Sequence, residues 1–200
     1  MKDNFNIIDL FPTPLYITSI SENNDLDIND FDFKDYTDRS TNTYVLKLQK
    51  YYNLKQEILT HINKFSYELG YAHKSYRITQ SWVNIKPISN SHHRHNHANS
   101  LISGVFYPKN NPDHIPAINF HKPEENFLLP RYLPVEESPN PQYSDTVKIK
   151  VSRNILILFP SYLAHSVDPN PNPQFRYSLA FNSIPLDSLG DENDLTELKF

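Results

Sequence analysis

Short apolar runs, separated by prolines and small polar residues, dominate the sequence between residues 76 and 185. Each run is rich in β-branched or aromatic residues, which is typical of strands bounded by turns. The runs are RITQSWVNIKP, SLISGVFYP, AINFHKP, TVKIKV, NILILFP and FRYSLAFNSI. Many short strands with no helical period between them predict an antiparallel sandwich, jelly roll or barrel, and argue against alternating strands and helices.

The segment from Asn53 to Gly70 has a different, helical period. Asn53 is suited to capping the first turn, with Gln56 three residues later, and Gly70 is suited to ending the helix. Because the helix stands alone ahead of the strands, we expect its apolar stripe to pack on the outside of a sheet. That stripe recurs at steps of four or three, at Leu54, Ile58, Ile62, Phe65 and Leu69.

The remaining segments carry weaker patterns. The proline-broken NIIDLFPTPLYITSI predicts an edge strand, and the acidic SENNDLDINDFDFKDYTDRSTNT predicts an exposed, solvated connector. The stretch from Lys122 to Asp145 is too long and proline-rich for a hairpin turn, which is typical of lids and binding loops. The C-terminal tail, residues 186–200, is predicted to be either a frayed end without fixed structure or a strap, meaning a segment packed across the domain.

The length of 200 residues suits one domain with a sizeable core. We expect a single domain over residues 1–200. Its predicted parts are an N-terminal edge strand, acidic loop and supporting helix in 1–75, a barrel core in 76–185 and a tail in 186–200.

Composition and charge narrow the classes of function. A net charge of -4, with no basic run interleaved with aromatics, argues against nucleic acid as a partner. The absence of cysteine excludes disulfides, thiol nucleophiles and thiolate ligands, so any metal must be held by His, Asp or Glu. No apolar run approaches the roughly 18 to 20 residues of a membrane span, and no signal sequence is evident. We therefore expect a cytoplasmic protein with no membrane partner.

A histidine tract raises the question of a metal site. His92, His93, His95 and His97 lie within six positions. In an extended strand, residues two apart point to one face, so His95 and His97 are predicted to project together, on the strand that runs into SLISGVFY. By itself the tract fits either a solvated polar segment or one side of a metal site.

A second segment favours the metal site. The apolar run NILILFP is followed by His165, then by a polar turn, and then by Arg176 and Ser178 two apart on one strand face. A single histidine after a buried strand is more often structural than a ligand. The arginine and serine that follow about ten residues later make the whole arrangement more specific than a single histidine would be.

Together these segments resemble the 2-oxoglutarate and Fe(II)-dependent dioxygenases, and in particular a bacterial and phage family of such oxygenases. That family's pattern is W-x-N, H-x-H, S-G-V-x-Y, F-P-S-x-x-x-H-x-V and R-x-S-x-x-F-N. Its residues here include Trp82, Asn84, His95, His97, Ser103 to Tyr107, Phe159 to Val167, and Arg176 to Asn182. FPTPLY, from Phe11 to Tyr16, is also similar to the family's N-terminus, so the resemblance covers most of the chain.

The resemblance implies a mainly β fold, a double-stranded β-helix or jelly-roll barrel with one or a few supporting α-helices. It also implies that Fe(II), 2-oxoglutarate and O2 are used to hydroxylate a substrate, with release of succinate and CO2. His95 and His165 correspond to metal ligands. His97 stands where the wider superfamily has a carboxylate, and this leaves three possible arrangements of the metal ligands. All three histidines bind the metal, or two histidines bind it and water completes the site, or His97 binds it while His95 lies in the outer shell. We favour the three-histidine arrangement.

The resemblance also implies a site for the keto acid. Arg176 would pair with its distal carboxylate through two charge-assisted hydrogen bonds, with Ser178 and Tyr107 as further donors. Asn84 would contact the keto acid or substrate, and Trp82 would form pocket wall or core. Without a ligand-binding role, Arg176 would instead form a surface ion pair, and Tyr107 would be an aromatic residue packed in the barrel.

Two further classes of function remain open at this point. One is a cupin-like metal-binding isomerase or ligand-binding module, and the other is a non-catalytic jelly-roll domain. The substrate, a small molecule or a peptide, is not indicated by the sequence, and a homodimer is compatible with it. We assign His92, His93 and His121 to the rim, and expect Asn154, where the family has glycine, to accept a left-handed turn.

Overall fold

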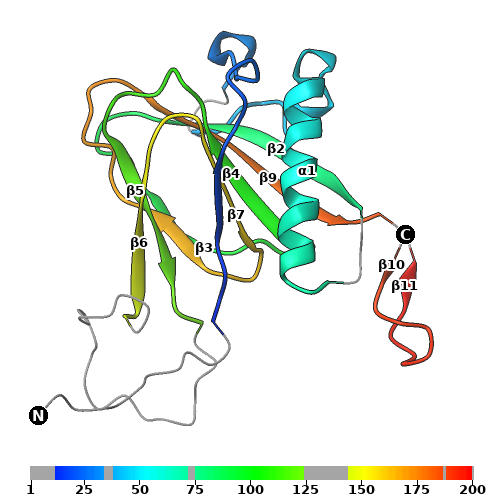
Figure 1. The fold of residues 1–200 in the computed structure, drawn as a ribbon. Helices are drawn as coiled ribbons and strands as arrows, with labels where there is room; N and C mark the ends of the chain where they lie inside the picture. Colours follow the sequence, from blue (N-terminus) through cyan, green and yellow to red (C-terminus); the bar gives the residue numbers. More distant parts are fainter. Residues whose placement is uncertain (1–11, 34–37, 72–74, 124–143, 187, 200) are drawn as a thin grey trace, which may run out of the picture.

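The computed structural model describes residues 12–33, 38–71, 75–123, 144–186 and 188–199. Among these residues, two antiparallel sheets share one core (Figure 1). The larger sheet has the order β1 (Tyr16–Ser19), β7 (Ile155–Pro160), β4 (Ile102–Tyr107), β9 (Arg176–Pro185) and β2 (Tyr76–Lys86). The smaller has the order β3 (His92–His95), β8 (His165–Val167), β5 (Ile115–His121) and β6 (Thr146–Val151).

The predicted mainly β jelly roll is confirmed, with each of the six predicted strands present. The two sheets face each other without closing into a barrel, because no described strand pairs across from one sheet to the other. The expectation that the histidine strand runs into SLISGVFY is wrong. β3 ends at His95, and Asn99, with φ of 54° in the left-handed region, turns the chain before β4 begins in the other sheet.

Alternation along the central strands of the larger sheet builds two apolar layers. On β4, Ile102 and Phe106 face the helix side, whereas Val105 and Tyr107 face the smaller sheet. Gly104 allows a close approach on the helix side of the sheet: an added Cβ would collide with the Phe181 ring and would lie 2.7 Å from Leu158 Cδ2. The helix-side layer is therefore closely packed at this point, whereas Val105 and Tyr107 belong to the separate layer between the two sheets.

The helix α1 (Tyr52–Glu68) covers the outer face of the larger sheet, as predicted (Figure 1). Its end is also as predicted: Gly70 has φ of 73°, its N–H donates to the Tyr67 carbonyl, and the Tyr71 N–H donates to the Ser66 carbonyl. The predicted Asn53 cap is wrong. Short 3-10 turns (Val45–Lys47 and Gln49–Tyr51) lead directly into the helix, and no side chain caps its first turn.

The described part of the acidic segment before the helix is mainly exposed loop, as its composition suggests, but it is anchored to the fold at a few buried positions. Leu26 and Phe31 are buried on either side of a 3-10 turn (Ile28–Asp30), and Ser40 is fully buried. The Ser40 N–H donates to the Val83 carbonyl at 2.8 Å, and the Ile85 N–H donates to the Asp38 carbonyl at 2.9 Å. A few apolar residues and these backbone bonds thus fasten the segment along the free edge of β2.

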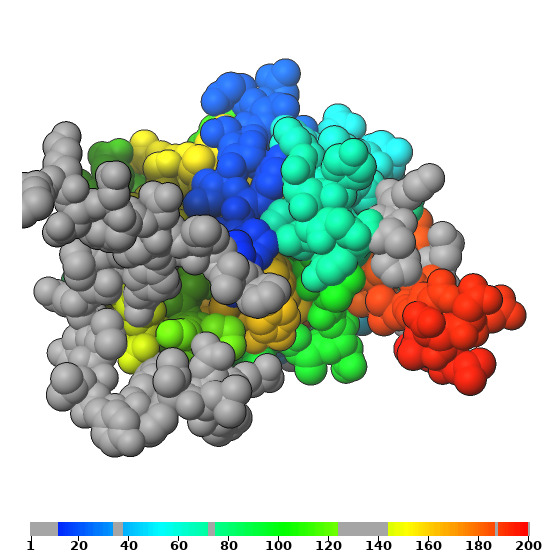
Figure 2. Space-filling view, turned by 60° about the horizontal axis from the view of Figure 1, so that its bottom comes forward, coloured from blue at the N-terminus to red at the C-terminus, as the bar shows by residue number. Residues whose placement is uncertain are grey.

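The tail forms neither a frayed end nor a packed strap. It folds as a hairpin of β10 (Ser188–Leu189) and β11 (Leu198–Lys199) that lies at the edge of the molecule, in red in Figure 2. Asn154 adopts the expected left-handed conformation, with φ of 62°. The predicted binding loop from Lys122 to Asp145 lies largely outside the described residues. No helix in the described part of the chain is both long and apolar enough to span a membrane.

Candidate metal centre

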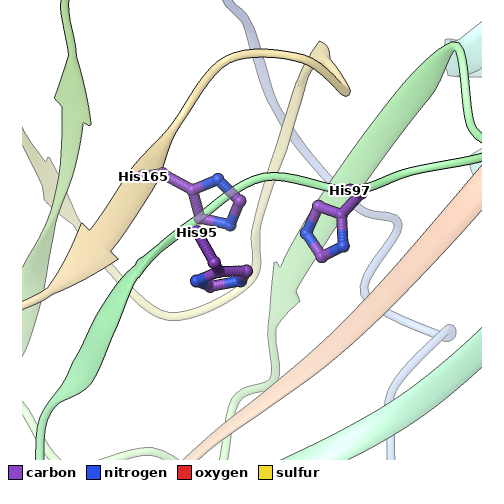
Figure 3. Close-up of side chains that lie close together, drawn as sticks. All are labelled: His95, His97 and His165. Carbon is purple, nitrogen blue, oxygen red and sulfur yellow. The ribbon is translucent and has the colours of Figure 1, made fainter.

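Three histidines from two neighbouring segments converge between the sheets (Figure 3). β3 pairs with β8 in a register that puts His95 directly opposite His165. His97 follows β3 in an irregular segment, where its N–H donates to the Ser161 carbonyl at 3.0 Å. The ligand atoms that the three rings offer all lie within 4.8 Å of one another. The predicted convergence of residues about 70 positions apart is therefore present.

Hydrogen bonds fix the tautomers of two of these rings. His95 Nδ1 lies 2.8 Å from the His93 carbonyl oxygen, and His165 Nδ1 lies 3.2 Å from the Leu163 carbonyl oxygen. A carbonyl only accepts, so each Nδ1 carries the proton and each Nε2 keeps its lone pair. This is the arrangement in which an outer hydrogen bond orients a histidine ligand toward a metal.

Burial keeps the rings uncharged at neutral pH. It lowers the pKa of His165 to about 3 and that of His97 to about 4, and it lowers the pKa of His95 as well. Proximity to His95 lowers the first two pKa values further. Metal binding requires the neutral imidazole, so the site meets this requirement without losing a proton.

The spacing fits one metal ion after small ring rotations. With metal–nitrogen bonds of about 2.0 to 2.1 Å, two ligand nitrogens on one ion are at most about 4.2 Å apart. The cluster contains no carboxylate among the described residues, and the three-histidine arrangement stays a prediction. Imidazole nitrogen suits Fe, Zn, Cu and Ni, so the ligand set itself does not select iron.

A narrow inner cavity of about 40 Å³ connects the histidines to the predicted keto-acid residues. Arg176 at the start of β9 is 2% exposed, which excludes the surface ion pair. Its Nε and Nη1 atoms have no hydrogen-bond partner among the described residues, and neither has the Tyr107 hydroxyl. Ser178, Asn84 and Trp82 also line this cavity, so all five residues predicted to contact the co-substrate face it.

The unpaired guanidinium is the most informative feature of the cavity. Burial lowers the pKa of Arg176 and raises that of Tyr107, and each group partly offsets the shift of the other. A buried charged donor left without a partner costs more than the usual 1–3 kcal/mol of a neutral one. Such a group is explained when a ligand supplies its acceptors, and a guanidinium fork matches a carboxylate.

One residue of the site was missed from the sequence. His92 was assigned to the rim because it is an odd number of positions from His95. On β3, however, His92 pairs with Val167 while His95 pairs with His165, so β3 has one extra residue and the two histidines share a face. The His92 ring stacks on that of His95, with centroids 4.5 Å apart, and lines the inner cavity. The sequence offers no signal for such a bulge.

The other two histidines assigned to the rim lie elsewhere. His93 is exposed, as expected, and lines a second, wider pocket that shares residues with the inner cavity. His121 on β5 contacts the hydroxyls of Thr146 and Ser166, at 3.1 and 2.9 Å, and does not line the cavity around the metal centre.

Two serines of the motif, Ser103 and Ser161, take part in one buried hydrogen-bond network. Ser103 Oγ lies 2.7 Å from Ser161 Oγ and donates to Asn182 Oδ1 at 2.9 Å, while the Ser161 carbonyl holds the N–H of His97. This buried network joins β4, β7 and β9 beneath the loop that carries His97. It therefore supports the position of that ring.

A jelly roll with three convergent histidines beside a buried arginine that has no partner among the described residues is the arrangement expected of metal-dependent oxygenases that use a keto acid. The comparison with protein families agrees: residues 80–182 match the family described as "Putative 2OG-Fe(II) oxygenase". This match spans more than half of the chain, and the chain belongs to that family. None of the curated proteins matches the chain.

Two solved structures, HygX and SnoN, share the fold with TM-scores above 0.5. HygX from Streptomyces hygroscopicus, with nickel, 2-oxoglutarate and hygromycin B bound, is 10% identical over 86% of this chain and 83% of its own, with a TM-score of 0.55. The epimerase SnoN from nogalamycin biosynthesis, with Fe3+, alpha ketoglutarate and nogalamycin RO, is 13% identical over 78% and 67%, with a TM-score of 0.54. An oxidoreductase of the 2OG-Fe(II) oxygenase family from Burkholderia pseudomallei is 14% identical, with a TM-score of 0.45. The match covers 62% of this chain but only 52% of that protein.

Proposed function

We propose that this protein is a 2-oxoglutarate- and Fe(II)-dependent dioxygenase that hydroxylates a C–H bond of its substrate. One observation carries the proposal: the buried Arg176, whose Nε and Nη1 have no partner in the described part of the chain, faces the same inner cavity as the three convergent histidines. A metal-binding module that used no keto acid would have no need of this buried cation. Membership of the oxygenase family supports the same conclusion.

The residues divide into two groups of binding roles. His95, His97 and His165 would hold the iron through their neutral rings, oriented by the carbonyls of His93 and Leu163. HygX, which shares the fold, was solved with both a metal and 2-oxoglutarate bound.

Arg176 would bind the distal carboxylate of 2-oxoglutarate through its fork, and the Tyr107 hydroxyl would donate a further hydrogen bond. Ser178 on the same strand face adds a hydroxyl to the cavity wall. Phe159 packs edge-on against the His165 ring at 4.7 Å between centroids and helps to exclude water from that side.

When bound, iron and 2-oxoglutarate supply the oxidation: substrate, O2 and 2-oxoglutarate become hydroxylated substrate, succinate and CO2. One oxygen atom enters the substrate, and the other enters succinate. The chain's own task is positioning. No general base is required beside the histidines, which fits the absence of a carboxylate from the described cluster.

Replacing the usual carboxylate ligand by neutral His97 leaves one more unit of positive charge at the metal. That charge favours binding of the doubly negative keto acid and alters the redox potential of the iron. The lack of cysteine and the need for ferrous iron are consistent with a reducing compartment, and we propose the cytoplasm.

The test is oxygen-dependent formation of succinate. Purified protein is loaded anaerobically with Fe(II) and 2-oxoglutarate, the visible charge-transfer absorbance is recorded, and succinate is quantified after oxygen is admitted. We expect the absorbance, and slow succinate formation even without substrate. His165→Ala should remove both, whereas Arg153→Gln, a surface change on the turn before β7, should retain both. If wild-type protein shows neither signal, the proposed function is wrong.

A further inference from the structure

The metal centre opens into an outer pocket of about 540 Å³ that reaches the surface. This pocket shares Trp82, Asn84, His92, His95 and His97 with the inner cavity, so the two form one continuous space. The outer part is large enough for a small molecule and lies on the solvent side of the histidines. It is therefore the place from which a substrate would approach the metal.

The wall of this pocket includes the acidic segment that was expected to be a solvated connector. Arg39 forms an antiparallel bridge with Asn84, and Asn84 in turn pairs with Ser178 on β9. Directly paired residues in antiparallel strands point to the same face of the sheet. Arg39 is thus the outermost member of a row that leads from the surface to the keto-acid residues.

The backbone around Arg39 is held in place. The neighbouring Ser40 is fully buried, and its hydroxyl accepts from the Val83 N–H at 3.0 Å. With the two backbone bonds to β2, this anchors the base of the Arg39 side chain. The guanidinium itself is exposed, and among the described residues it takes part in no hydrogen bond or ion pair.

The charge of the described pocket lining is not balanced. Asp38 is the only acidic residue in it, and Lys86 binds its Oδ2 at 2.7 Å while Asn90 donates to the same oxygen at 2.9 Å. The cation left without a counter-charge is Arg39. Deeper in, Lys86 lies directly opposite Arg176 in the pairing of β2 with β9. Because Lys86 is paired with Asp38, Arg39 gives the described wall one uncompensated positive charge, and this charge favours the approach of an anion.

The rest of the described lining is hydrophilic. Thr43, Gln80 and Asn182 contribute a hydroxyl and two amides, and Trp82 contributes the one large aromatic surface. Ser103 holds Asn182 through its amide oxygen. A lipid or a bulky apolar substrate would leave these polar groups without partners, at a cost in binding.

We propose that the substrate is a small hydrophilic molecule carrying an oxyanion, a carboxylate or a phosphate, which Arg39 binds at the pocket wall. The far end of the molecule is then held over the histidines, where its C–H bond is oxidised. This inference rests on the proposed function. It adds the class of substrate and a residue that selects it.

The experiment compares matched anionic and neutral compounds as stimulators of 2-oxoglutarate turnover. One arm uses the N-acetyl derivatives of the common L-amino acids against the corresponding carboxamides. The other uses glucose 6-phosphate, ribose 5-phosphate and glycerol 3-phosphate against glucose, ribose and glycerol. Succinate formation above the substrate-free rate is the readout. The two arms also distinguish a carboxylate from a phosphate.

The expected result is stimulation by one or more anionic compounds that exceeds that of the neutral partner. For such a compound, Arg39→Gln should raise KM about tenfold or more, since a charge-assisted hydrogen bond is lost. Arg39→Lys should recover part of the loss, and Arg39→Glu should abolish stimulation. Arg153→Gln removes one positive charge outside the pocket and should leave KM unchanged. Thermal melts of each variant verify folding.

Three results would overturn the inference: neutral compounds that stimulate as well as their anionic partners, an Arg39→Gln protein with wild-type KM, or stimulation by no compound of either set. In all three, the substrate-free rate of succinate formation remains as evidence for the proposed function. Loss of that substrate-free rate in the wild-type protein would instead contradict the proposed function itself.

Discussion

Replacing Arg176 by methionine should make the protein more stable and unable to respond to 2-oxoglutarate. Arg176 is 2% exposed, two of its guanidinium nitrogens lack partners among the described residues, and the residue lies across from Lys86. Even a buried ion pair can often be replaced by well-packed apolar residues with no loss or with a gain of about 1–4 kcal/mol, so removing an uncompensated buried charge should also be stabilising. For a chain of this size, 1 kcal/mol corresponds to about 2–4 °C in Tm. We expect a rise of several degrees in Tm.

The same melts measure ligand binding. At a concentration of 100 Kd, 2-oxoglutarate should add about 2.7 kcal/mol to the wild-type, Mn(II)-loaded protein, or about 5–11 °C. Arg176→Met should show no such increase. Arg153→Met, on the surface, is the control and should change neither quantity, because surface substitutions usually stay within about 0.5 kcal/mol. A variant that melts below wild type and still gains stability with 2-oxoglutarate would refute the assignment of Arg176.

Further predictions concern the metal ligands, the packing and the pH response. His97→Ala should weaken Mn(II) binding, measured by titration calorimetry, by about tenfold or more; unchanged affinity would show that His97 is not a ligand. Gly104→Ala should cost about 1–3 kcal/mol in urea unfolding, because its Cβ would crowd Leu158; an unchanged midpoint would contradict this packing. Asn154→Val should cost about 1–2 kcal/mol, since φ is 62° there, and glycine at this position should tolerate the same turn. The metal-free protein should lose stability as pH falls from about 6.5 toward 4, because the folded pKa values of His97 and His165 lie below the unfolded value; equal urea midpoints at pH 7.5 and pH 4.5 would contradict the burial of these rings.

The strands and the three histidines were accessible to prediction from the sequence because their physical causes are local. β4 and β7 are short apolar runs bounded by polar residues or proline, and the helix has a clear period. His95, His97 and His165 stand at motif positions whose order is specific. Their convergence follows once the strands are assigned to one jelly roll.

Other features depend on contacts between distant segments and leave no local trace. The extra residue in β3 brings His92 onto the ring of His95, against the strict alternation of an ideal strand. The segment around Arg39 is polar and acidic, yet hydrogen bonds to β2 fix it as a wall of the pocket. Amino-acid composition predicts only how exposed such a segment is on average. A few backbone hydrogen bonds to a neighbouring strand are enough to hold it in a fixed position.

The central claim is most directly tested by a crystal structure of the protein with Mn(II) and the inert analogue N-oxalylglycine. The account predicts one metal ion bound by nitrogen atoms of His95, His97 and His165, with the distal carboxylate of the analogue held by Arg176. A metal bound elsewhere, or an analogue that leaves the Arg176 guanidinium unpaired, would contradict it.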